Sequence, residues 1–215
     1  MVRRLAAIGA ALAACHRDAP PLPPGPPTAA QLLARIATCD PIGGPFATKP
    51  GVAPTVSICK LPGAVSWTAD LDVDCDGKVT TRCRSDNRKT AATDAAGHPL
   101  DAAALPYVVV PAPSARFDYL AAGLAPGSVF AVVYKDRVEY GVLGDVGPPA
   151  LIGEASYRMA ELLGIDPNPV TGGTADEVAY IGFTNSVISP IDDHQRAVTI
   201  GVIRAAVLLA TPRSW

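Results

Sequence analysis

The amino-acid sequence predicts a mainly β protein, a barrel with a few short helices. Several short apolar segments have strand-like patterns, few segments have helical spacing, and the 215 residues include 19 glycines and 22 prolines. Short strands separated by frequent turn residues are typical of all-β folds. An open β-sandwich would give the same pattern, because periodicity alone does not separate a sandwich from a barrel.

The longest expected strand begins near Val65. Its alternation predicts one face with Leu71, Val73 and Cys75, and an opposite, acidic face formed by Asp70, Asp72, Asp74 and Asp76. Further strands are expected at 107–110, 129–134, 138–143, 178–183 and 197–209. The second and third of these form a hairpin around 135–137.

Two segments have helical spacing. Residues 29–38 place Leu32, Leu33 and Ile36 on one face. Residues 156–163 begin at Ser156, a good N-cap, and end before Gly164. Residues 43–54 and 84–101 are expected to be loops.

The first residues resemble an export signal. Two arginines precede a short apolar stretch, so residues 1–14 are interpreted as a signal peptide. Leu12-Ala13-Ala14-Cys15 resembles a bacterial lipobox, in which Cys15 carries a lipid; ordinary cleavage beside an incidental cysteine is the alternative. Residues 15–28 then form a proline-rich tether, and 29–215 the folded domain. We expect an exported protein, lipid-anchored in the bacterial cell envelope or secreted.

The four cysteines after Cys15 suggest two disulfides, since exported chains are oxidised. Short loops close most readily, which favours Cys39–Cys59 and Cys75–Cys83 among three pairings. A zinc site is disfavoured because the chain contains no CxxC pair.

Two acids stand at the ends of elements around a Gly/Pro-rich turn. Asp145 follows Gly144 at the end of a strand, and Glu154 follows Gly153 before a helix, nine residues later. Glycosidases use such a pair, one acid to protonate the leaving oxygen and one carboxylate to activate water or attack the sugar. The alternative is that Asp145 caps a turn and Glu154 favours a helix N-terminus.

Three motifs occur in order: Trp67 to Gly77, then Gly144-Asp145, then Gly153-Glu154-Ala155-Ser156. Together they resemble the fungal chitosanases of glycoside hydrolase family 75. The resemblance implies endo-hydrolysis of β-1,4-linked glucosamine polymers with inversion. Segments around Asp145, Glu154 and 162–165 also resemble double-psi β-barrels, which implies six strands, with Glu154 as general acid and Asp145 as base. A carboxylate on the acidic strand, Asp70 to Asp76, is the alternative base.

The acidic strand offers a way to recognise such a polymer. Asp70, Asp72 and Asp74 could line a cleft for glucosamine ammonium groups; a solvated polar face and a partial calcium loop are the alternatives. Trp67 is a candidate sugar platform or a core residue, and His194 a candidate partner for a carboxylate or a loop residue.

Composition excludes some functions. A net charge of −2 without a basic stretch argues against nucleic acid as a partner. The sequence predicts a monomer that needs no cofactor or metal. The alternatives to a chitosanase are a hydrolase or lyase of another amino-sugar polymer, such as peptidoglycan, and a non-catalytic glycan-binding envelope lipoprotein.

Overall fold

The computed structural model describes residues 25–85 and 87–212. The predicted signal peptide, Cys15 and most of the tether lie outside the described residues. Within the described ranges, no helix is both long enough and apolar enough to cross a membrane.

Short strands dominate, and three helices accompany them. In chain order the elements are α1 (Ala29–Ile36), β1 (Cys59–Leu61), β2 (Ala64–Asp74), β3 (Tyr107–Pro111), β4 (Val129–Tyr134), β5 (Arg137–Gly147), β6 (Glu154–Ser156), α2 (Tyr157–Leu163), β7 (Thr174–Phe183) and α3 (His194–Ala210).

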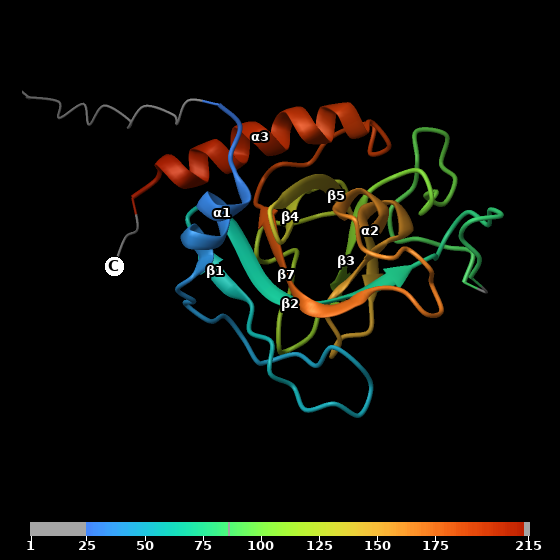
Figure 1. Ribbon diagram of the computed structural model, residues 1–215, viewed down its shortest axis with the longest axis horizontal. Helices are drawn as coiled ribbons and strands as arrows, with labels where there is room; N and C mark the ends of the chain where they lie inside the picture. The colour runs from blue at the N-terminus through green and yellow to red at the C-terminus, as the bar shows by residue number, and fades with distance from the viewer. Residues whose placement is uncertain (1–24, 86, 213–215) are drawn as a thin grey trace, which may run out of the picture.

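Six of the strands close into a barrel (Figure 1). The order β2-β6-β3-β5-β4-β7 returns to β2 through an antiparallel pairing of β7 with β2, and β1 extends the sheet beside β2. The β2–β6 and β3–β5 pairs are parallel, and the other pairs in the barrel are antiparallel. The six-stranded barrel expected from the sequence is therefore confirmed, and the sandwich is excluded.

Alternate residues of each strand fill the barrel. The interior contains Trp67, which stacks on Tyr180 with ring centroids 5.4 Å apart and meets the edge of Phe130 at 5.7 Å. A second apolar layer lies outside the barrel, where α1 and α3 pack against β4 and β5 (Figure 1). Strands β4 and β5 are therefore covered on both sides along part of their length, which explains continuously buried runs such as Val129–Tyr134.

The strand expected at 197–209 is wrong, because this segment forms the helix α3. Its valines and isoleucines favour a strand by intrinsic preference. Ala197, Gly201 and Ala205, however, recur every four residues and are all buried, so a helix presents a small, flat face to the barrel. Asp193 caps the helix by accepting a hydrogen bond from the Arg196 amide at 2.9 Å.

Other predicted elements match closely. The strand 129–134, the hairpin turn at Lys135-Asp136 and the helix between Ser156 and Gly164 are as expected. The short strands β1 and β6 were not predicted. Cys75 lies beyond the end of β2 and packs in the outer layer, not with Leu71.

Both favoured disulfides are present, Cys39–Cys59 and Cys75–Cys83. The first ties the segment after α1 to β1. The second closes the loop that follows the acidic end of β2. Two disulfides fit a protein of an oxidising compartment.

Gly201 provides a test of how α3 packs. A Cβ atom at Gly201 would lie 2.2 Å from Tyr140 Cδ1, so Gly201→Ala should lower the free energy of unfolding by about 1–3 kcal/mol. It should do so although alanine is the better helix former by about 1 kcal/mol. Urea denaturation measures the effect. The exposed Ile203→Ala on the same helix is the control, and equal stability of the two variants would contradict the packing described.

Candidate active site

A β-bulge in β5 sets the direction of Asp145. Val108 of β3 pairs with Leu143, but Val109 pairs with Asp145, so Gly144 is an extra residue in β5. Leu143 points into the barrel, and Val109 lies in the outer layer. Strict alternation from Leu143 would have turned Asp145 inward. Because of the extra residue, Asp145 instead lies on the outer face, beside Val109.

Glycine is required at the bulge because an aromatic ring covers it. A Cβ atom at Gly144 would lie 2.6 Å from both Cβ and Cγ of Tyr107 and 2.9 Å from Leu100 Cδ1. The close approach fixes Tyr107 over the strand that carries Asp145. Gly144 therefore directs Asp145 to the outer face and allows Tyr107 to pack beside it.

Asp145 and Glu154 lie in one row across the sheet. Val109 pairs with Asp145 on one side and with Glu154 on the other, and Glu154 in turn pairs with Asp72. Neighbouring strands are about 4.8 Å apart, which puts the Cα atoms of Asp145 and Glu154 about 9–10 Å apart. A Cβ atom at Gly147 would lie 3.5 Å from Glu154 Oε2, so this carboxyl extends toward the strand of Asp145.

Asp145 is 7% exposed and is held by backbone amides. Its Oδ1 accepts hydrogen bonds from the Ala91 amide at 2.7 Å and from the Val146 amide at 2.8 Å. Burial raises the pKa of Asp145, while these two amides act against that rise by stabilising the anion.

The influences on the pKa of Glu154 all act in one direction. Burial raises its pKa to about 8, and the negative charges of Asp74, Asp76, Asp72 and Asp145 add to the effect. A carboxyl group with this pKa holds its proton near neutral pH. Glu154 thus differs from Asp145, whose carboxyl group accepts two backbone hydrogen bonds that favour the anion.

Asp74 lies deeper than its place on the acidic strand suggested. It is 4% exposed, and its Oδ2 accepts a hydrogen bond from the Tyr107 hydroxyl at 3.0 Å. Its Oδ1 accepts one from the Asp76 amide at 2.7 Å. Burial is the main reason that the pKa of Asp74 rises to about 7. A direct substrate contact by this residue, as expected from the sequence, does not fit its burial.

Asp70 and Asp72 lie nearer to the surface. Lys49, from the loop before β1, places Nζ 3.5 Å from Asp72 Oδ1. Burial, then the neighbouring Asp72, raises the pKa of Asp70 to about 6. Asp70 Oδ1 is buried without a hydrogen-bond partner among the described residues, under Gly153, whose Cβ position would lie 2.3 Å away.

Two other predicted site residues lie elsewhere. Trp67 is 1% exposed inside the barrel, so its expected role as a sugar platform is wrong. His194 contacts Glu139 Oε1 at 3.3 Å and the Tyr140 carbonyl at 3.1 Å, near the start of β5. Six residues of strand, about 20 Å, separate Glu139 from Asp145. His194 therefore orients a carboxylate, but not one of the row.

Sequence reasoning missed Tyr107 and Lys49. Tyr107 was assigned only to a buried strand, because Asp74, its hydrogen-bond partner, is 33 residues away. Lys49 lies in a loop of no recognisable motif. Its only signal was a cationic side chain in a chain that also has an acidic strand.

The partial calcium loop has other partners in the structure. Asp76 accepts hydrogen bonds from Ser85 and Asn87, both at 2.5 Å. Among residues 25–85 and 87–212, no group of three or more His, Cys, Asp or Glu side chains is placed to hold a metal ion.

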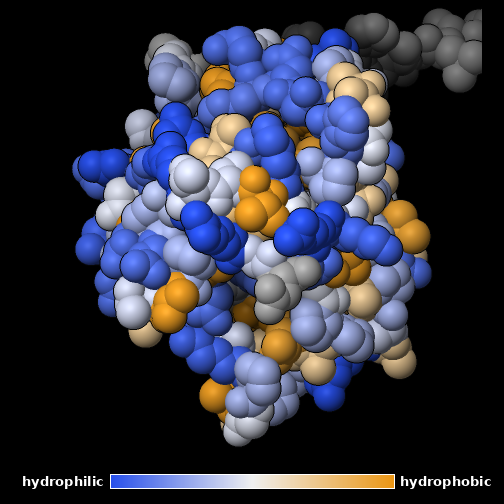
Figure 2. Space-filling model, turned by 90° about the vertical axis from the view of Figure 1, so that its right-hand side faces the viewer, coloured by the Kyte–Doolittle hydropathy of each residue, from blue (hydrophilic) through white to orange (hydrophobic). Residues whose placement is uncertain are grey.

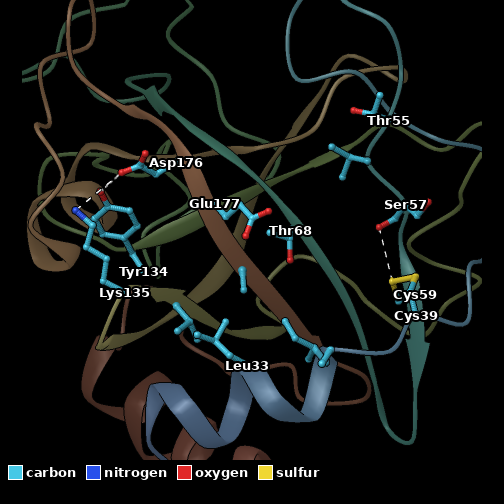
Figure 3. Close-up of a pocket in the computed structure, with 15 residues that line it drawn as sticks. Leu33, Cys39, Thr55, Ser57, Cys59, Thr68, Tyr134, Lys135, Asp176 and Glu177 are labelled. Carbon is cyan, nitrogen blue, oxygen red and sulfur yellow. Dashed lines mark hydrogen bonds and ion pairs between the residues drawn. A yellow bond between two sulfur atoms is a disulfide. The ribbon is translucent and has the colours of Figure 1, made fainter.

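The acidic end of β2 and its neighbouring loops face right in Figure 1. Figure 2 shows that this side of the molecule is mainly hydrophilic, with scattered apolar residues. A cleft of about 730 Å³ lies elsewhere, between α1, β1 and the outer faces of β4 and β7 (Figure 3). Tyr134 and Asp176 meet there through a 3.0 Å hydrogen bond, but neither Asp145 nor Glu154 lines that cleft.

Glycoside hydrolases use a pair of carboxyl groups, and here two carboxyl groups lie on the barrel surface with one strand between them. Comparison with known proteins agrees: residues 71–200 match the family described as fungal chitosanase of glycosyl hydrolase group 75. The chain belongs to this family, and the matched region contains both acids.

Curated relatives include an endo-chitosanase of Aspergillus oryzae, 35% identical over 57% of this chain and 56% of the relative. Endo-chitosanase B of the same species is 37% identical over 56% of each chain. An endo-chitosanase of Aspergillus fumigatus is 31% identical over 60% of this chain and 62% of the relative. The chain thus spans little more than half the length of these relatives.

Ionisation of Glu154 should weaken the fold. Its pKa is raised from 4.5 to about 8 in the folded protein, so the folded state binds the proton more tightly than the unfolded state. The free energy of unfolding must then fall as pH rises between these two values. Glu154→Gln, which cannot ionise, should be more stable than the wild type at pH about 8.5, by on the order of 1–3 kcal/mol.

Urea denaturation at pH about 5 and about 8.5 measures this difference. Glu177→Gln, at an exposed site, is the matched control and should follow the wild type. If Glu154→Gln loses as much stability with rising pH as the wild type does, Glu154 is not a buried acid.

Proposed function

We propose that this protein is an endo-chitosanase, which hydrolyses β-1,4 glycosidic bonds between glucosamine units with inversion at the anomeric carbon. The observation that carries the proposal is the row in which Val109 separates Asp145 from Glu154. The names of its relatives support the substrate.

Glu154 acts as the general acid. It must give a proton to the glycosidic oxygen as the bond breaks, and a carboxyl group with a pKa of about 8 retains that proton at neutral pH. Its chain extends toward Gly147, which leaves space beside the carboxyl for a bulky polymer.

Asp145 acts as the general base. Two backbone amides hold Oδ1 and stabilise the anion, so the carboxylate is fixed in position to take a proton from water. Inverting enzymes separate their two carboxyl groups by about 6.5–9.5 Å, which leaves room for that water. Two strand spacings, shortened by the lean of Glu154 toward β5, favour this range over the 5–5.5 Å of retaining enzymes.

Asp70 and Asp72 bind ammonium groups of the polymer. Lys49 supports this role, because its own ammonium already lies 3.5 Å from Asp72 Oδ1. A primary ammonium therefore fits the site, and a glucosamine ammonium has the same charge and hydrogen-bond donors. Exchange of one cation for another would cost little, because both members of the pair are about half exposed.

Glu154→Gln and Asp145→Asn should each lower kcat on chitosan by about 10²–10⁴-fold, because each removes one proton transfer. Reducing-sugar release measures the rate, and circular dichroism checks the fold. Asp136→Asn, exposed in the β4–β5 hairpin, is the control. Near-normal activity of either active-site variant would overturn its role. Release of products from peptidoglycan but not chitosan would assign the site to another amino-sugar polymer.

Lys49→Gln should lower KM for glucosamine oligomers about 2–5-fold with kcat nearly unchanged, because the ammonium that competes with substrate is removed. Initial rates at low ionic strength measure it, since salt screens the interaction. Lys60→Gln, exposed on β1, is the matched control. A higher KM for Lys49→Gln would mean that Lys49 helps to bind the polymer and does not compete with it for Asp72.

A further inference from the structure

Asp74 is a buried carboxyl group at the outer end of β2 for which the proposed reaction has no direct use. At 4% exposure it does not contact a polymer. Burying a carboxyl group is costly unless its oxygens have hydrogen-bond partners. We therefore looked for an effect of Asp74 on the neighbouring side chains of the site.

Two hydrogen bonds hold the Asp74 side chain in place. The Tyr107 hydroxyl donates to Oδ2 at 3.0 Å, and the Asp76 amide donates to Oδ1 at 2.7 Å. Tyr107 is itself fixed, because its ring covers Gly144 and its backbone amide donates to Ser156 Oγ at 3.0 Å. Asp74 is thus tied to β5 through the bulge and to β6 through Ser156.

The same ties place Asp74 close to Glu154. In the parallel β2–β6 pair, Asp72 is the partner of Glu154 and Asp74 is the partner of Ser156. Asp74 is therefore the diagonal neighbour of Glu154 on the same face of the sheet, at a distance of about 7–8 Å between backbones.

The charged groups with the largest effect on Glu154 are acidic. They are Asp72 and Asp74 from β2, Asp76 from the loop after β2, and Asp145 from β5. Lys49, which lies close to the row, pairs with Asp72. Asp74, like Asp145, combines burial with two hydrogen bonds to its carboxylate, so its charge is poorly screened by water. Asp74 lies on the strand next to Glu154, whereas β3 separates Asp145 from Glu154.

We propose that Asp74 is a positioning residue: its buried carboxylate, held by Tyr107, keeps the proton on Glu154 and so maintains the general acid. This inference rests on the proposed function of Glu154. It assigns to Tyr107 a supporting role, since its hydroxyl stabilises the anionic form of Asp74.

The order of ionisation is consistent with this role. The pKa of Asp74 is about 7 and that of Glu154 about 8, and each is raised partly by neighbouring carboxylates. As pH rises, Asp74 loses its proton first, and its negative charge then opposes ionisation of Glu154. Removing the charge of Asp74 should therefore let Glu154 ionise at lower pH.

The test is a direct titration of Glu154 in the full chain. The sequence contains only four glutamates, Glu139, Glu154, Glu161 and Glu177. Carbon-13 labelling of glutamate carboxyl groups therefore gives few NMR signals, and the signal lost in Glu154→Gln identifies Glu154. In Asp74→Asn the midpoint for Glu154 should move to lower pH by about one unit, as expected for losing one charge at this distance.

Tyr107→Phe provides a second, milder variant if Asp74→Asn does not fold. It removes the hydrogen bond that favours the Asp74 anion, so the Glu154 midpoint should move in the same direction by a smaller amount. Asp176→Asn, in the cleft between α1 and β7, is the matched control and should leave the midpoint unchanged.

Kinetics give an independent readout. In Asp74→Asn the alkaline limb of the kcat/KM profile on chitosan should shift to lower pH in parallel with the NMR midpoint. An unchanged Glu154 midpoint in folded Asp74→Asn, or in Tyr107→Phe, would overturn the proposal, whatever the loss of stability. A wild type that fails to cleave chitosan would overturn the proposed function instead, since the NMR titration needs no substrate.

Discussion

The candidate site depends on one extra residue in one strand. Without the bulge at Gly144, the alternation of β5 would direct Asp145 into the barrel among Leu143 and its apolar neighbours. A carboxylate there would be buried without partners, which costs several kcal/mol. The bulge instead places Asp145 beside Val109 on the outer face, two strands from Glu154. Because the extra residue is glycine, Tyr107 can pack over it and reach Asp74.

The site gathers acids that repel one another, and the fold must offset that repulsion. Backbone amides bind Asp145, the Tyr107 hydroxyl binds Asp74, and Lys49 pairs with Asp72. Glu154 has burial and negative neighbours instead, which raise its pKa to about 8. Different partners thus give chemically similar groups different affinities for protons, which the proposed reaction requires of its acid and its base.

Much of the fold was predictable because local signals agreed with it. Alternation identified β2, a hairpin turn identified β4 and β5, and Ser156 with Gly164 delimited α2. The prediction failed at α3, where packing of Ala197, Gly201 and Ala205 on the barrel overrides the strand preference of the valines. The two acids were identified from their glycine contexts and a family resemblance. Their place in one row was not predictable, since it depends on the register of β3 with two other strands.

The stereochemistry of the first product depends on the spacing between the carboxyl groups of Asp145 and Glu154. Proton NMR of a β-1,4 glucosamine oligomer during the first minutes of hydrolysis distinguishes the anomers before they interconvert. Two carboxyl groups separated by two strand spacings, with water between them, should release the α-anomer first. Initial release of the β-anomer would mean a retaining reaction, with the two carboxyl groups only about 5–5.5 Å apart, and would contradict the account.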